Sequence, residues 1–416
     1  MPAVTEAYTT AWRRAATKGV GYPQTRLHGS ARVSAISTFL ANGARPKYKP
    51  NAAGGTGTGT RVVYDYQRSG SPFRAIRIVD QSDGVSAPVE LTLGRAGLPQ
   101  RHAGAAVWHP TANYLVFQAE ADPHYLSTIP AYDYLGNPGL GFHCDLWCST
   151  ATGAALTNLT NYTHAQTSLD TVKMVLFPQF NTDGSKLIWT EIAGPHPLVG
   201  PPTSAWQSWR MMFANFSLPA GVPTISAPAP FFSAPAYGGN YVVPMGYFDQ
   251  YDILAAGNLE GQHEYRMDLY RIFTNTFTHP PLPGGFYQRL NLTSDRFWTE
   301  GSTVTPAGRV VSMTGRWSRF EMPEDQNAQW DTYVRESDLS LQDGAAQLAN
   351  LERLTYFNDP AAPEFDAPNG RTTVAVMGVK PDGLEILVSY RTDSGPWWTP
   401  VHSEVGIRRI TLTSPI

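Results

Sequence analysis

Hydrophobic and polar positions along the chain repeat one short pattern, a polar turn followed by three or four apolar residues. In FNTDGSKLIWTEIAG (180–194), Asn181, Asp183 and Gly184 favour a tight turn, and residues 187–189 favour a buried strand. The pattern recurs as HPTANYLVFQAE from His109, TPAGRVVSMTGR from Thr305, KPDGLEILVSYR from Lys380 and, more loosely, FDQYDILAAGN from Phe248. Each copy predicts two strands joined by a turn.

Two further phrases accompany these turns. An aspartate followed by aliphatic and aromatic residues recurs at Asp145, Asp268 and Asp331, and a Leu-Thr ending recurs at Thr92, Thr160, Thr293 and Thr355. Thr92 and Thr160, like Thr293 and Thr355, lie roughly 60–70 residues apart, and Thr160 and Thr293 lie about two such intervals apart. Short strands repeating at this period predict sheets arranged around an axis rather than a helical solenoid.

The predicted fold is therefore all-β: a six-bladed β-propeller of four-stranded antiparallel blades, with seven blades left open. One domain is expected over residues 30–416, with blades at about 30–97, 98–165, 166–228, 229–294, 295–358 and 359–416. The inner strand of the first blade is expected within residues 31–39, and the Gly/Thr tract at 52–60 is interpreted as a flexible insertion. Residues 1–29 form an N-terminal segment that can supply a closing strand.

With these three phrases in place, the sequence resembles the TolB-like β-propellers, whose PD40 or WD40-like repeats carry a Ser-Pro-Asp-Gly turn. NTDG and KPDG are the nearest copies, and HPTA and TPAG are degraded ones. The resemblance covers about residues 30–413 and includes a poorly characterised exported branch of the family. It implies the propeller fold. It leaves function open, because such propellers are protein-docking modules, gating domains of peptidases or lyase-like enzymes.

Composition narrows the function classes. Charged residues make up 16% of the 416 residues and the net charge is −3, without the basic patch of a nucleic-acid-binding protein. No apolar run is long enough to cross a membrane, and the first residues lack the apolar region of a signal peptide. The protein is then either cytosolic or an exported protein whose leader lies outside this numbering. The low charge and the triplets NLT, NYT and NFS favour the exported alternative, periplasmic or extracellular.

The two cysteines, Cys144 and Cys148, are four positions apart. On one strand they would lie about 13 Å apart, beyond the ~7 Å that a disulfide allows between Cα atoms. Two buried free thiols are the preferred interpretation, and a bridge across a bulge or turn stays open.

Catalytic motifs are not found. The sequence has no G-x-S-x-G, no H-E-x-x-H, no P-loop lysine and no C-x-x-C-H, so no catalytic residue and no cofactor are predicted. His102, before the inner strand of the second blade, and Glu300, in the inner strand of the fifth, are weak candidates for contact with a ligand in the channel. A structural or solvated role is the alternative for both, and a divalent metal in the channel stays open.

Other recurring residues are expected to serve the fold. Asp145, Asp268 and Asp331 should hydrogen-bond a neighbouring turn. Trp108, Trp147, Trp189 and Trp298 should fill the core between blades.

Long segments rich in Pro and aromatic residues interrupt the repeat at 121–143, 193–209 and 217–240. Without structure of their own, such loops are usually functional or disordered. Their composition suits a surface that contacts proteins, with the following candidate contact residues: Tyr125, Tyr132, Tyr134, Trp206, Phe231, Phe232 and Tyr237.

The sequence therefore favours a non-enzymatic, exported binding or scaffold module with a protein partner, able to enter a larger complex. The alternative is a propeller enzyme, a lyase or hydrolase that acts on polysaccharide at the channel mouth. The identity of partner or substrate and the oligomeric state are left open.

Overall fold

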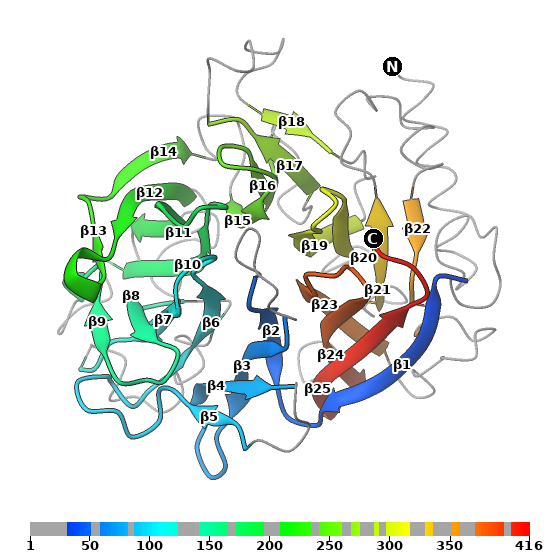
Figure 1. The fold of residues 1–416 in the computed structure, drawn as a ribbon, viewed down its shortest axis with the longest axis horizontal. Helices are drawn as coiled ribbons and strands as arrows, with labels where there is room; N and C mark the ends of the chain where they lie inside the picture. Colours follow the sequence, from blue (N-terminus) through cyan, green and yellow to red (C-terminus); the bar gives the residue numbers. More distant parts are fainter. Residues whose placement is uncertain are drawn as a thin grey trace. The chain divides into compact units, whose positions relative to one another are not determined.

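The strands of the protein form antiparallel sheets in chain order. The computed structural model describes residues 31–50, 59–81, 87–123, 138, 141–164, 172–194, 209–233, 241–259, 268–274, 287–290, 297–316, 329–335, 351–355, 357, 371–394 and 401–416. Within these residues the protein is all-β, apart from a short 3-10 turn, η3 (Pro219–Gly221), and its sheets have the arrangement of β-propeller blades (Figure 1).

The first three sheets follow the order of the chain from the inner strand outward. The first is β2(Ala44–Tyr48), β3(Arg61–Gln67), β4(Arg74–Asp80) and β5(Val89–Glu90); the second is β6(Ala103–Trp108), β7(Tyr114–Glu120), β8(Cys144–Thr150) and β9(Leu156–Asn158). The third is β10(Val172–Phe180), β11(Lys186–Gly194) and β12(Trp209–Ser217), with β13(Thr224–Ile225) and β14(Ala229–Ser233) both pairing with β12.

The later sheets repeat this order, and the last one takes in the first strand of the chain. The fourth is β15(Val242–Tyr247), β16(Ile253–Gly257), β17(Asp268–Ile272) and β18(Tyr287–Arg289); the fifth is β19(Phe297–Val304), β20(Val310–Arg316), β21(Gln329–Arg335) and β22(Leu351–Arg353). The sixth is β23(Arg371–Val379), β24(Glu385–Ser394), β25(Val401–Leu412) and β1(Val33–Leu40).

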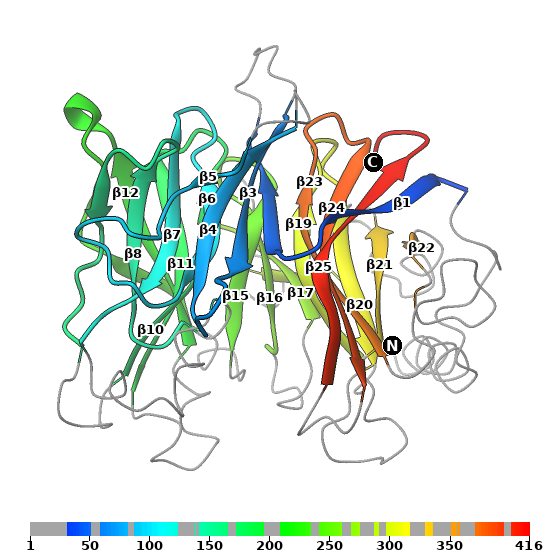
Figure 2. The same ribbon diagram turned by 90° about the horizontal axis from the view of Figure 1, so that it is seen from below.

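Two details differ from the sequence-based prediction. Five of these sheets have four strands as predicted, but the sheet of β10–β14 has five, because the 217–240 segment is not a plain loop and contributes β13 and β14. The expectation that residues 31–39 form the inner strand of the first sheet is also wrong, because β1 pairs with β25 and β2 takes the inner position. Figures 1 and 2 show β1, in blue, alongside the red β25. Residues 1–29 lie outside the described residues.

The chain divides into two compact units. One comprises Met1–Ala44, Tyr251–Ala256 and Gln262–Ile416, and the other comprises Arg45–Gln250 and Gly257–Gly261. The first three sheets belong to the second of these units, which is called the β2–β15 unit below.

The repeated turn has the predicted conformation. In NTDG, the Gly184 amide donates to the Asn181 carbonyl (3.1 Å) at φ +80°, and the same contact occurs in TPAG and KPDG. In HPTA the side chain of His109 helps to close the turn, because its Nδ1 accepts hydrogen bonds from the amides of Thr111 (3.2 Å) and Ala112 (2.9 Å). The degraded copy therefore makes its turn with a side chain.

Apolar side chains fill the spaces between neighbouring sheets. Trp108, Phe117 and Ile78 belong to the core between the first and second sheets, and Trp189 belongs to that between the second and third. Trp108 and Trp189 are buried, which confirms their predicted place, and Trp147 is half-buried against the first of these cores. The side chain of Trp298 is outside the described part.

A bulge in the inner strand recurs from sheet to sheet. Arg45, Ala105, Phe177 and Gly301 have φ between +50° and +57°, and the register shifts beside the last three. A bulge leaves a backbone group outside the ladder. In β6 that group is the Ala105 amide, which donates to both carboxylate oxygens of Asp65 on β3 (3.1 and 3.2 Å).

In the third sheet, the Thr190 hydroxyl donates to the Val242 carbonyl on the next inner strand (2.7 Å).

Asp65 is fully buried, and burial raises its pKa to about 6 although Arg45 and Arg74 oppose the shift. In the folded state the Asp65 carboxyl therefore stays protonated between about pH 4 and pH 6. In the unfolded chain the same carboxyl loses its proton over this range. Stability associated with this group is full below pH 4 and falls as the pH rises through 6, with a slope of at most about 1.4 kcal/mol per pH unit.

We expect Asp65→Asn to remove this dependence, because the amide oxygen still accepts from Ala105 and nothing at the site titrates. The measurement is the free energy of unfolding by urea from pH 4 to pH 7.5 for both proteins, since other groups cancel in their difference. The variant should gain stability relative to the wild type as the pH rises to 6. A difference independent of pH would contradict the assignment.

Candidate functional site

One end of the second and third sheets, where β7 and β11 stop, carries a set of buried charged groups. Its main members are Glu120, Asp145 and Glu191, which are 1%, 4% and 1% exposed. The insertions predicted at 121–143 and 193–209 join β7 to β8 and β11 to β12 at this same end. We call it the insertion end of the β2–β15 unit.

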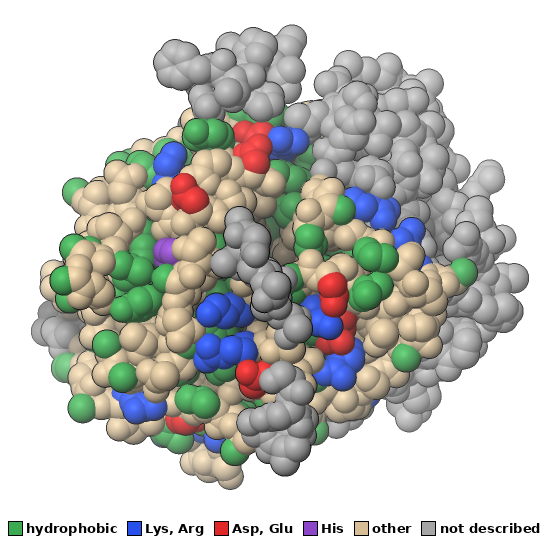
Figure 3. All heavy atoms as spheres, in the orientation of Figure 1, with side chains coloured by type: hydrophobic (Ala, Val, Ile, Leu, Met, Phe, Trp, Pro, Cys, Tyr) green, Lys and Arg blue, Asp and Glu red, His purple; other side chains and the backbone are tan. Residues whose placement is uncertain are grey.

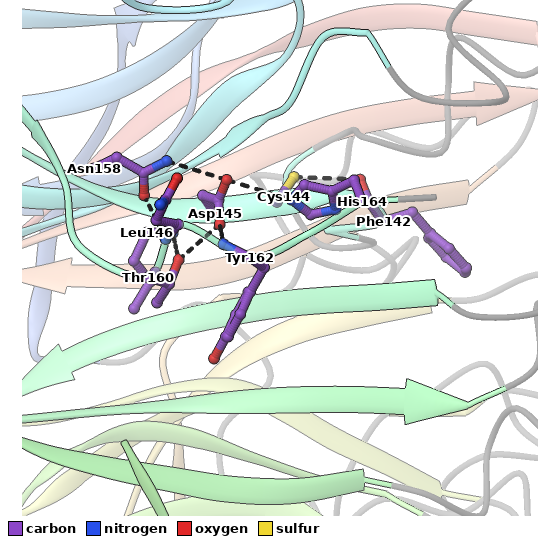
Figure 4. Close-up of polar contacts among 9 residues, drawn as sticks. Phe142, Cys144, Asp145, Leu146, Asn158, Thr160, Tyr162 and His164 are labelled. Atoms are coloured by element: carbon purple, nitrogen blue, oxygen red, sulfur yellow. Dashed lines mark hydrogen bonds and ion pairs between the residues drawn. The ribbon is translucent and has the colours of Figure 1, made fainter. Parts of the chain in front are cut away.

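Asp145, at the start of β8, accepts hydrogen bonds from four groups of one segment (Figure 4). Its Oδ1 accepts from the Thr160 hydroxyl (2.9 Å) and the Tyr162 amide (2.8 Å). Its Oδ2 accepts from the Asn158 amide group (3.2 Å) and lies 3.3 Å from His164 Nε2. Burial alone would raise the Asp145 pKa, but the contacts with His164, Tyr162 and Thr160 outweigh it, so the pKa is lowered.

The recurring aspartate is thus a structural group in this sheet, which confirms the prediction that it hydrogen-bonds a neighbouring turn. Asp268, the equivalent residue on β17, forms an ion pair with Arg289 on the next strand (2.5 Å). The side chain of Asp331 is outside the described residues.

The Leu-Thr ending has a role that the sequence pattern did not reveal. The Thr160 hydroxyl accepts a hydrogen bond from the Leu146 amide (3.0 Å), and Thr92 accepts one from Ile76 in the first sheet (3.0 Å). A threonine at this position thus binds the outer end of the sheet to its third strand. The regular interval between the threonines reflects this contact.

Glu191 on β11 is the central charged group of the third sheet at the insertion end. Its carboxylate accepts from Lys173 Nζ (2.8 Å), from Arg210 (2.7 Å) and from the Tyr162 hydroxyl (2.5 Å). Burial opposes ionisation of Glu191, yet these donors hold its pKa below the usual value. Burial and the hydrogen bond to Glu191 raise the pKa of Tyr162 well above its usual value. Tyr162 therefore connects Asp145 to Glu191 across the two sheets.

His102 lies in the same unit, and its ring contacts neighbouring groups of the fold. It is 2% exposed, its Nδ1 accepts from the Arg74 amide (3.1 Å), and its ring meets Phe73 edge-on (5.2 Å between centroids). An acceptor at Nδ1 places the ring proton of the neutral imidazole on Nε2. Beside it, Arg101 forms a buried ion pair with Glu120 (2.8 Å).

Of the other candidate residues from the sequence, only some are among the described residues. Glu300 lies on β19 opposite Met313, beside the bulge at Gly301, and its side chain is outside the described residues. Phe231 and Phe232 are neighbours on β14; Phe232 is 5% exposed, which leaves little of its ring for a partner, and Phe231 is half-buried. The remaining aromatic candidates lie outside the described residues: Tyr125, Tyr132, Tyr134, Trp206 and Tyr237.

Cys144 and Cys148 are free and buried on β8, which confirms the preferred interpretation. Burial raises the pKa of Cys148 to about 12, and burial together with Glu120 and Asp145 raises that of Cys144 well above its usual value. Both are thiols at neutral pH and therefore poor nucleophiles.

Within the described part of the chain, no three or more His, Cys, Asp and Glu side chains gather in a way that could hold a metal ion. In the same residues, no helix is long and apolar enough to cross a membrane.

The insertion between β7 and β8 is held at both of its ends. The Ala121 amide donates to the His143 carbonyl (2.8 Å), so the entering and returning segments contact each other. The returning segment also pairs with β10: the His143 amide donates to the Lys173 carbonyl (2.8 Å), and the Gly141 carbonyl accepts from the Val175 amide (3.1 Å). The base of this insertion is therefore part of the second and third sheets together.

Comparisons with known proteins give distant structural likenesses. No protein-family model matches the chain, and no curated protein matches it. Among solved structures, TolB from Acinetobacter baumannii is similar at 11% identity and TM-score 0.41, covering 86% of this chain and 65% of that one. An oligogalacturonate lyase in complex with manganese is similar at 11% identity and TM-score 0.41, covering 92% and 95%. A prolyl endopeptidase is similar at 10% identity and TM-score 0.40, covering 99% and 47%.

The chain thus spans less than two thirds of the TolB chain and about half of the prolyl endopeptidase chain. At these identities and TM-scores, the likenesses carry no conclusion about activity, and the relation to TolB-like propellers stays a resemblance.

We expect Gly141→Ala to weaken the base of the insertion. At φ +66°, an added Cβ would lie 2.2 Å from the Val175 carbonyl oxygen, so backbone must move. Loss of this pairing should cost about 2–4 kcal/mol, compared with about 1–2 kcal/mol for positive φ alone.

The matched control is Gly94→Ala, because Gly94 has a similar φ of +70° with open space around it. Urea unfolding of both variants measures the difference. Equal losses of stability in the two variants would show that the contact of Gly141 with β10 does not contribute to the free energy of unfolding.

We expect Asp145→Ala to destabilise the protein by about 3 kcal/mol, because it leaves buried donors of Thr160 and Tyr162 without their acceptor. Since the pKa of Asp145 is lowered in the folded state, its contribution is present above about pH 4 and is lost as the pH falls further. The measurement is urea unfolding at pH 7 and pH 3, with the exposed turn residue Asp382→Asn as control. A loss as large at pH 3 as at pH 7 would contradict this account.

Proposed function

We propose that this protein is an exported, six-bladed β-propeller that binds a protein partner through the insertions at its insertion end and has no catalytic role of its own. One observation carries the proposal: the ends of the β7–β8 insertion are built into the second and third sheets through Ala121, Gly141 and His143. A segment anchored to two sheets is presented by a rigid support, which lowers the entropy cost of binding.

The chemistry of the support agrees with this function. The buried carboxylates of Glu120, Asp145 and Glu191 are engaged by groups of the fold itself. They stabilise the frame, and contact with a partner is then left to the insertions. Residues 124–137 and 195–208 contain Tyr, Trp, Pro and His with one acidic residue and no Lys or Arg, a composition suited to the core of a protein interface.

We narrow the proposed contact residues on the basis of burial. Phe232 is buried in the sheet, so we place the contact on the two insertions, with Phe231 at most at its border. The proposed contact residues are Tyr125, Tyr132, Tyr134 and Trp206.

The test replaces residues 124–137 and 195–208 with short Gly/Ser linkers and keeps the base at Gly141–His143. Tagged wild type and variant are recovered from the native host, and co-purifying proteins are identified by mass spectrometry. We expect a partner of the wild type to fall at least tenfold with the variant. The control replaces residues 51–58, the connection between β2 and β3, and should retain the partner.

Recovery of the same partner in equal amount by the insertion variant would contradict the proposal. So would the breakdown of any of a panel of polysaccharides by the purified wild type, because that result would favour the enzyme alternative.

A further inference from the structure

One histidine joins the second and third sheets at the end opposite the insertion end. His109 follows β6 and opens the turn that leads to β7, whereas the insertion end is where β7 stops. Its ring packs against Phe180 at the end of β10 and Phe216 on β12, with centroids 4.9 and 5.4 Å away. His109 is 6% exposed, and Figure 3 shows little histidine surface on the face drawn. The ring is therefore part of the core between two sheets.

Hydrogen bonds fix the protonation state of this ring. Its Nδ1 accepts from the amides of Thr111 (3.2 Å) and Ala112 (2.9 Å), so the proton of the neutral imidazole is on Nε2. Nε2 faces Gly184 in the NTDG turn, where an added Cβ would lie 2.4 Å from it. The Gly184 backbone hydrogen-bonds the ring, and its carbonyl is the group that can accept from Nε2–H. One neutral ring thus accepts in its own turn and donates to the turn of the next sheet.

Two other copies of the turn use side chains that do not titrate at the position of His109. Asn181 Oδ1 accepts from the Lys186 amide (2.9 Å), and the Thr305 hydroxyl accepts from the Arg309 amide (3.1 Å). An amide or a hydroxyl keeps the same charge at acidic and neutral pH. The histidine therefore gives the β6–β7 turn a dependence on pH that these two turns lack.

Protonation of the ring is incompatible with its contacts. A proton on Nδ1 would point at two amide donors, so both hydrogen bonds within the turn would be lost. The positive charge would also be held between Phe180 and Phe216, away from water. Burial accordingly lowers the pKa of His109, although Gly184 and Asp183 oppose the shift. The neutral ring holds the turn closed, and the charged ring favours an open turn in which it reaches water.

Asp183 is the charged group that acts on the ring, and it belongs to the NTDG turn. Burial would raise the pKa of Asp183, but hydrogen bonds with Ser185 lower it, so Asp183 stays ionised in mild acid. Its charge favours the imidazolium form and makes the joint less sensitive to acid than burial alone would.

The direction of the pH dependence follows from the lowered pKa. In an open turn the ring titrates near its usual pKa of about 6.5, whereas in the closed turn it stays neutral to lower pH. The stability that the joint contributes is full above about pH 6.5 and is lost as the pH falls from there through the lowered pKa of the closed turn.

We propose that His109 is an acid-sensitive joint, whose protonation opens the β6–β7 turn and releases it from the NTDG turn of the third sheet. The contact of Tyr162 with Glu191 at the insertion end lies at the other end of the strands and remains. The protein thus has a response to acid that does not depend on which partner it binds.

The test measures amide hydrogen exchange of the full chain at pH 7.5 and pH 5, with rates corrected for the intrinsic effect of pH. We expect the protection of a peptide covering residues 110–115 to fall at least about fivefold at pH 5, because an opening that takes up a proton becomes more frequent as the pH falls. A peptide covering residues 145–150, on β8 of the same sheet, should change less than about twofold, because no strand is opened.

His109→Asn is the matched variant, because Asn181 already occupies this position in the NTDG turn. The amide oxygen still accepts and nothing titrates, so the loss of protection in acid should disappear. Asp183→Asn is a second variant, which keeps an acceptor for the Ser185 amide and removes the charge that favours imidazolium. It should lower the pKa of His109 in the closed turn further and enlarge the loss of protection at pH 5.

Equal protection of residues 110–115 in the wild type at both pH values would overturn the inference. So would a loss in His109→Asn as large as that in the wild type, because the titrating group would then lie elsewhere. Near-UV circular dichroism at pH 7.5 shows whether each variant is folded. If His109→Asn does not fold, Asp183→Asn decides, since a loss of protection smaller than that of the wild type would contradict the joint.

Discussion

Burial of the Asp145 carboxylate organises the insertion end. A charged group this far from water is costly unless several donors surround it. Asp145 has them because residues 158–164 turn back along β8 and offer two side chains, an amide and an imidazole. The outer strand is thereby tied to β8, and Tyr162 is brought to Glu191. The second and third sheets then share one polar frame.

The frame explains why this end can carry long insertions without losing the sheets. The insertion between β7 and β8 leaves after Glu120 and returns at Gly141, where it pairs with β10. Hydrogen bonds at its base satisfy backbone groups that a long loop would otherwise leave exposed. Variation in the inserted sequence is thus separated from the stability of the blades, as is common for binding proteins built on rigid sheets.

The two cations over Trp108, Lys49 and Arg61, follow a different physical rule. At the insertion end every described buried carboxylate has cationic or neutral donors, so charge is balanced inside the fold. At Trp108, both cationic side chains lie over a buried indole and donate to one amide oxygen, that of Asn113.

Much of the architecture was predictable from local patterns. Turns at Asn181, Thr305 and Lys380, buried tryptophans at 108 and 189, and the recurring aspartate all follow from short-range chemistry that repeats in each sheet. The role of the Leu-Thr ending was not predictable, because the partner amide of Thr160 is 14 positions away in the chain. Similarly, nothing in the sequence near Gly141 indicates that β10 comes within hydrogen-bonding distance of it.

By itself, then, the sequence determined that the chain is all-β, built from repeated turn-and-strand units with tryptophan between them. Periodicity and turn chemistry are local, and each copy expresses them independently. Only the tertiary structure decided that residues 33–40 pair with β25, that 224–233 join the third sheet, and that Lys49 and Arg61 meet over Trp108. These outcomes depend on which strands become neighbours, and that choice is made by the packing of whole sheets, not by any one stretch of residues.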